Sequence, residues 1–345
     1  MSTNIAQKGP QSSLILFNRT TSRATSHAET LNGRATVASS LTEAVQNADV
    51  IFTCVGDDPA IDAITTAILA DQSADLSTKT FIDCSTVHPD TSRRTEAAYA
   101  ARGASFVACP VFGAPNMADA GQLIVVPAGK QSSIAKAKPF FEGVTAKSTI
   151  DLSDGTGEDI DVGKASTLKV LGNTFILNTV GVLAETVVAA ESTGLGVGPL
   201  KQWLDLFAPG PFAKYADRMI TGDYYQRDEP LFAVDLARKD LRHASSLAKE
   251  GGQRMRNVEV TDSFLQDVKE EKGEKGDIAG VYGAARKAAG MKYENQDEKW
   301  IIIDIYCEII IECKQDSWYD AARAQPTFLL RLLLVCRDWR YSQYY

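Results

Sequence analysis

The first 150 residues alternate between short β-branched runs and helix-forming segments, and this alternation limits the chain to few folds. Residues 14–17, 49–55, 80–84 and 105–109 have the composition of buried strands. The stretches between these runs are long enough to hold helices. Strands spaced in this way join through right-handed crossovers into a mostly parallel sheet with helices on both faces. The sequence therefore predicts a doubly wound, Rossmann-like α/β domain.

Local capping signals indicate where two of the helices begin. Ser40 and Glu43 have the spacing of a capping box, which opens a helix at this point. Asp58 directly precedes Pro59, so we expect Asp58 to be the N-cap of a helix that extends to residue 70.

Beyond about residue 160 the hydrophobic pattern changes from strand-like to helical. Apolar residues recur at helical spacing over about residues 164–192 without a proline, and Gly194 and Gly196 end that helix. Helical segments separated by polar turns continue to about residue 290. We therefore expect three parts: the α/β domain over residues 1–160, an all-α domain over residues 161–295, and a tail over residues 296–345.

Charge and cysteine content exclude several classes of protein. Lys and Arg total 36 and Asp and Glu total 44, and the formal net charge of −8 argues against a dedicated nucleic-acid binder. The six cysteines include no CxxC pair, and His27, His88 and His243 are isolated from one another in sequence, so no metal site is predicted. The longest apolar stretch, residues 300–313, contains three carboxylates and is too short to span a membrane. We expect a small-molecule partner.

Polar residues follow the first predicted strand. Asn18, Arg19 and Thr20 come directly after it, and Arg23 follows within one helical turn. In a dinucleotide-binding fold, this position meets the adenosine ribose, where a carboxylate binds the 2′-hydroxyl of NAD and an arginine accommodates the 2′-phosphate of NADP. The segment has no carboxylate and therefore favours NADP. A polar turn with no ligand accounts for the same residues equally well.

Lys169 and Asn173 are four residues apart in the predicted long helix, so their side chains lie on one face. A partly buried lysine with a lowered pKa can exchange a proton with a substrate hydroxyl, and a carboxamide can orient the same substrate. Most helical lysines are solvated instead, so a surface lysine remains the alternative for this pair.

Two segments place small or hydroxylated residues at the carboxyl ends of predicted strands. Residues 109–123, CPVFGAPNMADAGQL, let backbone N–H groups approach a ligand, and residues 83–86, DCST, contribute hydroxyls. Ligands of parallel sheets bind at this edge. Each segment taken alone is also compatible with ordinary turn chemistry.

Taken in order, these segments resemble the β-hydroxyacid dehydrogenase family, which includes 3-hydroxyisobutyrate dehydrogenase and the NADPH-dependent glyoxylate and succinic semialdehyde reductases. The resemblance extends to about residue 295. It rests on NRT at residue 18, DCSTVHP at 83, CPVFGAPNMADAGQL at 109, GKASTLKVLGN at 163 and KDLRHA at 239. The related 6-phosphogluconate dehydrogenases have KxxHN at the catalytic helix, whereas Gly172 stands at the histidine position here, which disfavours decarboxylating chemistry.

The resemblance implies roles for particular residues. Lys169 would be the catalytic acid/base in hydride transfer between a nicotinamide and a small β-hydroxy acid or aldehyde acid. The substrate would contact Ser85, Thr86, Phe112, Gly113, Ala114 and Asn173. NADP, preferred over NAD, would contact Asn18, Arg19, Thr20, Arg23, Val55 and Lys239. The resemblance allows a homo-oligomer, and we expect a cytoplasmic location, or a mitochondrial one if a leader precedes Met1.

Three departures from the family pattern qualify these expectations. Family members open with a strand and a GxGxxG turn, but this chain opens at MSTNIAQKG, within what would be the first helix. We therefore expect two strand edges that face a gap and no glycine-rich turn for the pyrophosphate. Phe112, Gly113 and Ala114 replace the usual Ser-Gly-Gly, and residues 296–345 match nothing expected. A second interpretation therefore stays open: a cofactor-deficient, non-catalytic member or a mispredicted gene product.

Overall fold

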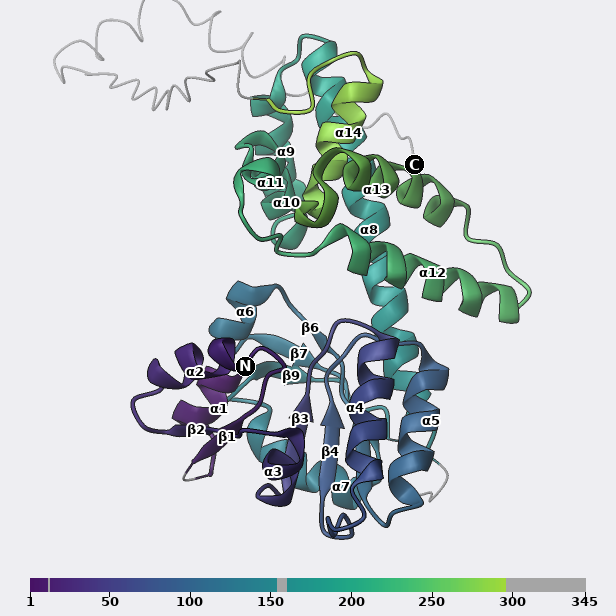
Figure 1. Cartoon of the computed structure of the whole chain (residues 1–345). Helices are drawn as coiled ribbons and strands as arrows, with labels where there is room; N and C mark the ends of the chain where they lie inside the picture. The colour runs from purple at the N-terminus through teal and green to yellow at the C-terminus, as the bar shows by residue number, and fades with distance from the viewer. Residues whose placement is uncertain (12, 154–159, 296–345) are drawn as a thin grey trace, which may run out of the picture. The chain divides into compact units, whose positions relative to one another are not determined.

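A computed structural model describes residues 1–11, 13–153 and 160–295 of the chain (Figure 1). The tail over residues 296–345 lies outside the described residues. All described residues belong to the compact unit Met1–Asp297, and the division at residue 160 stays a prediction.

Parallel strands separated by helices form the first part, as the sequence predicts. The central sheet has the order β3-β4-β5-β8, in which the first three strands are parallel and β8 is antiparallel to β5. Every residue of β4 is buried because β4 lies between two neighbours and under helices. The elements are β3 (Val50–Thr53), α4 (Asp58–Ala70), β4 (Thr80–Asp83), α5 (Pro89–Ala100), β5 (Ser105–Ala108) and β8 (Ala128–Gly129).

A second, smaller piece of parallel sheet stands at the N-terminal side. β1 (Leu14–Leu16) pairs only with β2 (Ala35–Val37), and α2 (Thr21–Glu29) connects the two strands. Among the described residues, no strand joins β1 to β3, so each of these strands has one unpaired edge. The gap is the one expected from a chain that opens in a helix, here α1 (Ser2–Lys8).

The segment predicted as a ligand loop after β5 is more ordered than a loop. Its first residues form β6 (Val111–Phe112), a short helix α6 (Pro115–Asp119) follows, and β7 (Leu123–Val125) returns antiparallel to β6. β9 (Ala146–Thr149) pairs in parallel with β7 and completes a three-stranded sheet. α7 (Gln131–Ala137) and the 3-10 turn Lys138–Phe140 lie between β8 and β9. Phe112 is therefore held on a strand.

Ser40 caps its helix as predicted, but the Glu43 carboxylate accepts from the amide and hydroxyl of Ser39 instead of the Ser40 amide, and the N-cap predicted at Asp58 is wrong. At α3 (Leu41–Gln46), the Ser40 side chain accepts a hydrogen bond from the Glu43 amide at 3.1 Å. At α4 the N-cap is Asp57, whose carboxylate accepts from the Ala60 amide at 3.0 Å, and Asp58 is the first helical residue. The Asp58 carboxylate instead accepts bonds from groups on and beside α5, so it is not available to cap its own helix.

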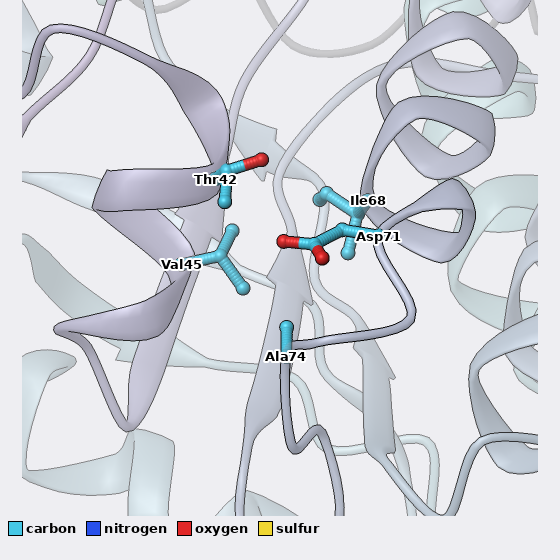
Figure 2. Close-up of a pocket in the computed structure, with 5 residues that line it drawn as sticks. All are labelled: Thr42, Val45, Ile68, Asp71 and Ala74. Carbon is cyan, nitrogen blue, oxygen red and sulfur yellow. The ribbon is translucent and has the colours of Figure 1, made fainter.

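The packing of α3 against α4 closes one side of the sheet. Figure 2 shows Val45 of α3 facing Ile68 of α4 and Ala74, with the Asp71 carboxylate between Val45 and Ile68 and with Thr42 beside Val45. Val45, Ile68 and Ala74 are buried, and they belong to the hydrophobic cluster that continues to β4 and β5. This hollow is therefore a packing contact and offers no binding site.

From Gly163 to Ala288 the described regular structure is helical, as predicted. α8 (Gly163–Ser192) is the 30-residue helix expected from the apolar periodicity, and α12, α13 and α14 pack along it. By length and composition α8 could cross a membrane, but 56% of its most apolar window is buried within the protein. The other helices are α9 (Val197–Phe207), α10 (Pro211–Ile220), α11 (Asp223–Gln226), α12 (Val234–Glu250), α13 (Arg256–Lys272), α14 (Val281–Ala288) and the 3-10 turns Gly273–Lys275 and Ile278–Gly280.

Candidate active site

Lys169 lies buried in the second turn of α8. Only 9% of its surface is exposed. Its Nζ donates a hydrogen bond to the Asn173 Oδ1 at 2.9 Å, so the two residues share a helix face as their spacing predicts. The same Nζ lies 4.5 Å from the ring centroid of Phe112 on β6. The structure thus brings three of the predicted site residues into contact.

A chain of buried polar groups connects Lys169 to the end of β4. The Asn173 Nδ2 donates to the Asp240 carboxylate on α12 at 2.7 Å. The other oxygen of Asp240 pairs with the Lys239 Nζ at 3.1 Å. Lys239 in turn donates to the backbone carbonyl of Thr86. Groups from α8, α12 and the segment after β4 therefore meet at one place.

Burial changes the acid strength of Lys169. Desolvation lowers its pKa from 10.5 to about 8, an effect that the carboxylate of Asp240 opposes and the ammonium of Lys239 reinforces. An amine with this pKa is present in both protonation states near neutral pH. It can therefore donate a proton to a substrate and accept one back.

Ser85 and Val55 lie at the carboxyl ends of adjacent strands. The Ser85 Oγ accepts a hydrogen bond from the Val55 amide at 2.9 Å, and the Ser85 amide donates to the Asp83 carboxylate at 3.0 Å. Desolvation raises the pKa of Asp83 to about 6, although the bonds from Ser85 oppose this. The Ser85 side chain thus bonds both to the Val55 amide and to the Asp83 carboxylate, and it ties the carboxyl ends of β3 and β4 together.

Phe112, which ends β6, and the two residues after it have different surroundings. Phe112 packs against α8 so closely that a Cβ on Gly172 would lie 2.5 Å from the Phe112 Cε1. Gly113 has a φ of 139°, which side chains rarely allow, and Ala114 is the N-cap of α6. Within the part of the chain that the structure describes, Phe112 is the one of these three that contacts Lys169.

The predicted ribose-binding residues lie apart from this cluster, on the β1–β2 piece of sheet. The Asn18 Oδ1 accepts a hydrogen bond from the Thr20 amide at 2.8 Å, and Thr20 is the N-cap of α2. The side chains of Arg19 and Arg23 are exposed. They are therefore accessible to an anion from solvent.

The sequence analysis missed Asp240, although it lies beside Lys239 in the KDLRHA motif. Its partner, Asn173, is 67 residues away in sequence, so no local pattern indicated the contact. The one available signal was the position of Asp240 directly after Lys239, because a buried charge needs an oppositely charged partner.

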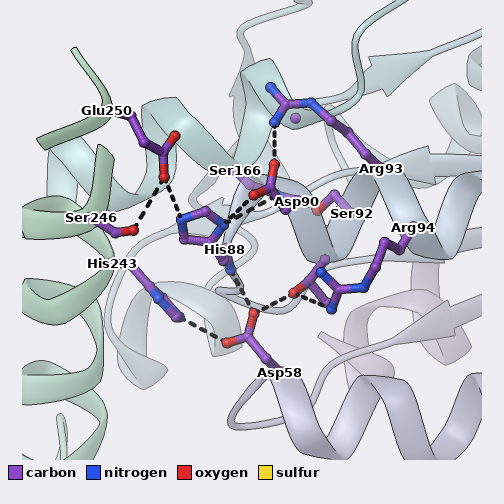
Figure 3. Close-up of polar contacts among 12 residues, drawn as sticks. Asp58, His88, Asp90, Ser92, Arg93, Arg94, Ser166, His243, Ser246 and Glu250 are labelled. Atoms are coloured by element: carbon purple, nitrogen blue, oxygen red, sulfur yellow. Dashed lines mark hydrogen bonds and ion pairs between the residues drawn. The ribbon is translucent and has the colours of Figure 1, made fainter. Parts of the chain in front are cut away.

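Two of the three histidines, which are far apart in sequence, lie close together in space. Figure 3 shows His88 and His243 side by side, with ring centroids 5.3 Å apart. His243 on α12 pairs with Asp58 on α4 at 2.8 Å, and Thr91 donates to the same carboxylate. Desolvation raises the pKa of Asp58, but these bonds and one from the His88 amide outweigh it and hold the pKa well below 3.8. This contact ties α12 to α4 near Lys239.

His88 also has two carboxylates nearby. Its ring nitrogens lie 3.6 Å from Asp90 and 4.0 Å from Glu250, and all three groups have ligand atoms within 4.8 Å of one another. Both carboxylates are exposed and nothing else in the described structure indicates an ion, so the expectation of no metal stays a prediction.

Comparison with known proteins fits this arrangement. Residues 1–152 match the model of the NAD binding domain of 6-phosphogluconate dehydrogenase. Over 300 residues the chain is 32% identical to the NADH-dependent oxidoreductase ucdB of Aspergillus ustus, which spans 86% of this chain and 99% of that protein. The chain belongs to the β-hydroxyacid dehydrogenase family. By family it is an NAD(P)-dependent oxidoreductase.

Solved structures share the fold of this family member. The 3-hydroxyisobutyrate dehydrogenase of Mycobacterium tuberculosis, solved with L-serine, aligns with a TM-score of 0.67 at 23% identity, over 83% of this chain and 94% of that one. Psf3, solved with NADP+ and 2-OPP, aligns with a TM-score of 0.67 at 19% identity, over 81% of this chain and 93% of that one. Both alignments therefore extend over the α/β part and the helical part of this chain.

The first testable prediction concerns the effect of the Asp240 carboxylate on the pKa of Lys169. In Asp240→Asn the pKa of Lys169 falls further below about 8, because the carboxylate that favours its charged form is removed. The rate of carbamylation of Lys169 by cyanate, followed across pH by peptide mass spectrometry, measures this pKa. Asp235→Asn, an exposed carboxylate on the same helix that pairs with Lys269, is the matched control. An unchanged or raised pKa of Lys169 in Asp240→Asn contradicts the electrostatic account.

Proposed function

We propose that the protein transfers hydride between NADP(H) and a small β-hydroxy acid or aldehyde acid, with Lys169 exchanging the hydroxyl proton. The observation that carries this proposal is the buried amine of Lys169, with its lowered pKa, hydrogen-bonded to Asn173. The family assignment supports the nicotinamide cofactor.

The chemistry of the donor groups fits NADP at two places. Arg19 and Arg23 would hold the 2′-phosphate, for which exposed guanidinium groups are suitable partners. Ser85 and Lys239, at the carboxyl end of β4, would meet the nicotinamide end. When bound, the nicotinamide supplies or accepts the hydride.

The residues of this chain would handle the proton and the orientation of the substrate. In carbonyl reduction the Lys169 ammonium donates its proton to the oxygen that becomes the hydroxyl, and in oxidation the neutral amine takes that proton back. Asn173, held by Asp240, keeps the amine in place through its Oδ1. The bond from Lys239 to the Thr86 carbonyl holds α12 against the end of β4.

The choice of NADP rests on the residues after β1. No carboxylate stands at Asn18, Arg19 or Thr20 to bind the 2′-hydroxyl of NAD. The relative ucdB is named NADH-dependent, and Psf3 was solved with NADP+, so relatives of both kinds exist. The proposal for NADP therefore depends on the two arginines of this chain.

A non-catalytic family member is the second candidate function. The observation that favours it is the gap between β1 and β3, together with the lack of a GxGxxG turn among the described residues. That turn places the pyrophosphate on a helix N-terminus in dinucleotide-binding folds. Turnover by the chain alone, and by the chain with a strand and GxGxxG turn added before Met1, separates the candidates. Activity of the chain alone rejects the non-catalytic candidate, and inactivity of both forms supports it.

Replacement of the lysine tests the catalytic assignment. Lys169→Ala is expected to lower kcat by about 10²- to 10⁴-fold in whichever form is active, because proton transfer loses its acid and base. Steady-state kinetics with the hydroxy acid and the cofactor measure this. Lys164→Ala, an exposed lysine of the same helix, serves as the control and keeps kcat. Full activity in Lys169→Ala would show that another group carries the proton.

Cofactor titrations test the role of the arginines. With the glycine-rich turn added, NADPH is expected to bind about tenfold tighter than NADH or better, a difference of about 1.4 kcal/mol that one charge-assisted arginine contact can supply. Without the turn, both cofactors are expected to bind weakly. Arg19→Ala should reduce the ratio, and equal affinities in the parent protein would overturn the preference for NADP.

A further inference from the structure

Phe112 and Gly172 fit together beside the reactive amine. The Phe112 ring centroid lies 4.5 Å from the Lys169 Nζ. A Cβ on Gly172 would lie 2.5 Å from Cε1 and 2.6 Å from Cζ of the same ring. The ring therefore occupies the space above Gly172, one turn along α8 from the lysine, and the absence of a side chain at Gly172 permits this position.

If Lys169 exchanges its proton with a substrate hydroxyl, that hydroxyl and the Phe112 ring both lie next to the same Nζ. A hydroxyl hydrogen-bonded to the amine lies about 3 Å from Nζ, which is less than the distance from Nζ to the ring centroid. A substrate bound on the ring side of Nζ brings the substituents on the carbon next to the reacting one to the ring. The ring offers no hydrogen bond to replace the water lost by a polar substituent, whereas an apolar substituent gains from leaving water there.

We propose that Phe112 determines the substrate class, and that the protein acts on β-hydroxy acids or aldehyde acids that carry an aryl or branched alkyl substituent next to the reacting carbon. This proposal rests on the proposed function of Lys169. An aryl substituent fits best, because aromatic rings pair in offset or edge-to-face geometry. The Phe112 ring offers no hydrogen bond and gains only from apolar contact, so unsubstituted hydroxy acids are the poorer substrates.

Two hydroxy acids that differ by one phenyl group test the proposal. In the active form, kcat/KM for 3-hydroxy-2-phenylpropanoate is expected to exceed that for 3-hydroxypropanoate by about tenfold or more, the discrimination that an apolar pocket can supply. Phe112→Ser is expected to remove or reverse this preference, and Phe112→Leu, which keeps an apolar side chain, is expected to retain most of it. A preference of the parent for 3-hydroxypropanoate, or an equal loss for both compounds in Phe112→Ser, overturns the proposal.

Gly172→Ala provides a second variant that leaves Phe112 in place. Its added Cβ must displace the ring, so the preference for the phenyl compound is expected to fall as in Phe112→Ser. Thermal unfolding of each variant establishes that it is folded. If Phe112→Ser does not fold, Gly172→Ala decides the outcome, and an unchanged preference in a folded Gly172→Ala contradicts the proposal.

Binding without turnover separates this proposal from the proposed function. Calorimetry with the two hydroxy acids is expected to give tighter binding of the phenyl compound, and Phe112→Ser is expected to lose that difference. If the protein turns over neither compound but binds them in this way, the specificity stands and the catalytic function falls. If it turns over both without preference, the catalytic function stands and the specificity falls.

Discussion

The site depends on the chain of buried polar groups to which α8 and α12 contribute side chains. Lys169 bonds to Asn173, Asn173 to Asp240, and Asp240 pairs with Lys239, whose ammonium also bonds to the Thr86 carbonyl. Charges removed from water are tolerated only when they are paired and hydrogen-bonded, so removal of any one member leaves another without compensation. The helical part and the carboxyl end of β4 must therefore meet for the lysine to have its environment.

The same burial that prepares Lys169 for proton exchange carries a cost in stability. Its pKa falls from 10.5 to about 8 on folding, so the unfolded chain binds more protons between these values. The contribution of Lys169 to the free energy of unfolding therefore rises as the pH rises from about 8 to 10.5. Below about pH 8 the burial of the charged lysine lowers the free energy of unfolding by its full amount. A lysine that only stabilised the fold would have its pKa raised by a partner, which is the opposite arrangement.

Local patterns sufficed for β1, β3, β4 and β5, for the long helix α8 and for the pair of residues on it, because hydrophobic period and i to i+4 spacing are properties of neighbouring residues. Local patterns were insufficient wherever a segment distant in sequence determined the partner of a side chain. Asp58 does not cap its own helix because His243, 185 residues later, and Thr91 bond to its carboxylate. Asp240 was missed because its contact with Asn173 comes from the packing of α12 on α8.

The pH dependence of both directions of the reaction tests the role of Lys169 most directly. The account predicts that kcat/KM for oxidation of the hydroxy acid rises with pH through about 8, as the amine becomes neutral, and that kcat/KM for carbonyl reduction falls through the same pH. Both transitions should disappear from the residual activity of Lys169→Ala. Transitions that persist unchanged in that variant would contradict the assignment of the proton to Lys169.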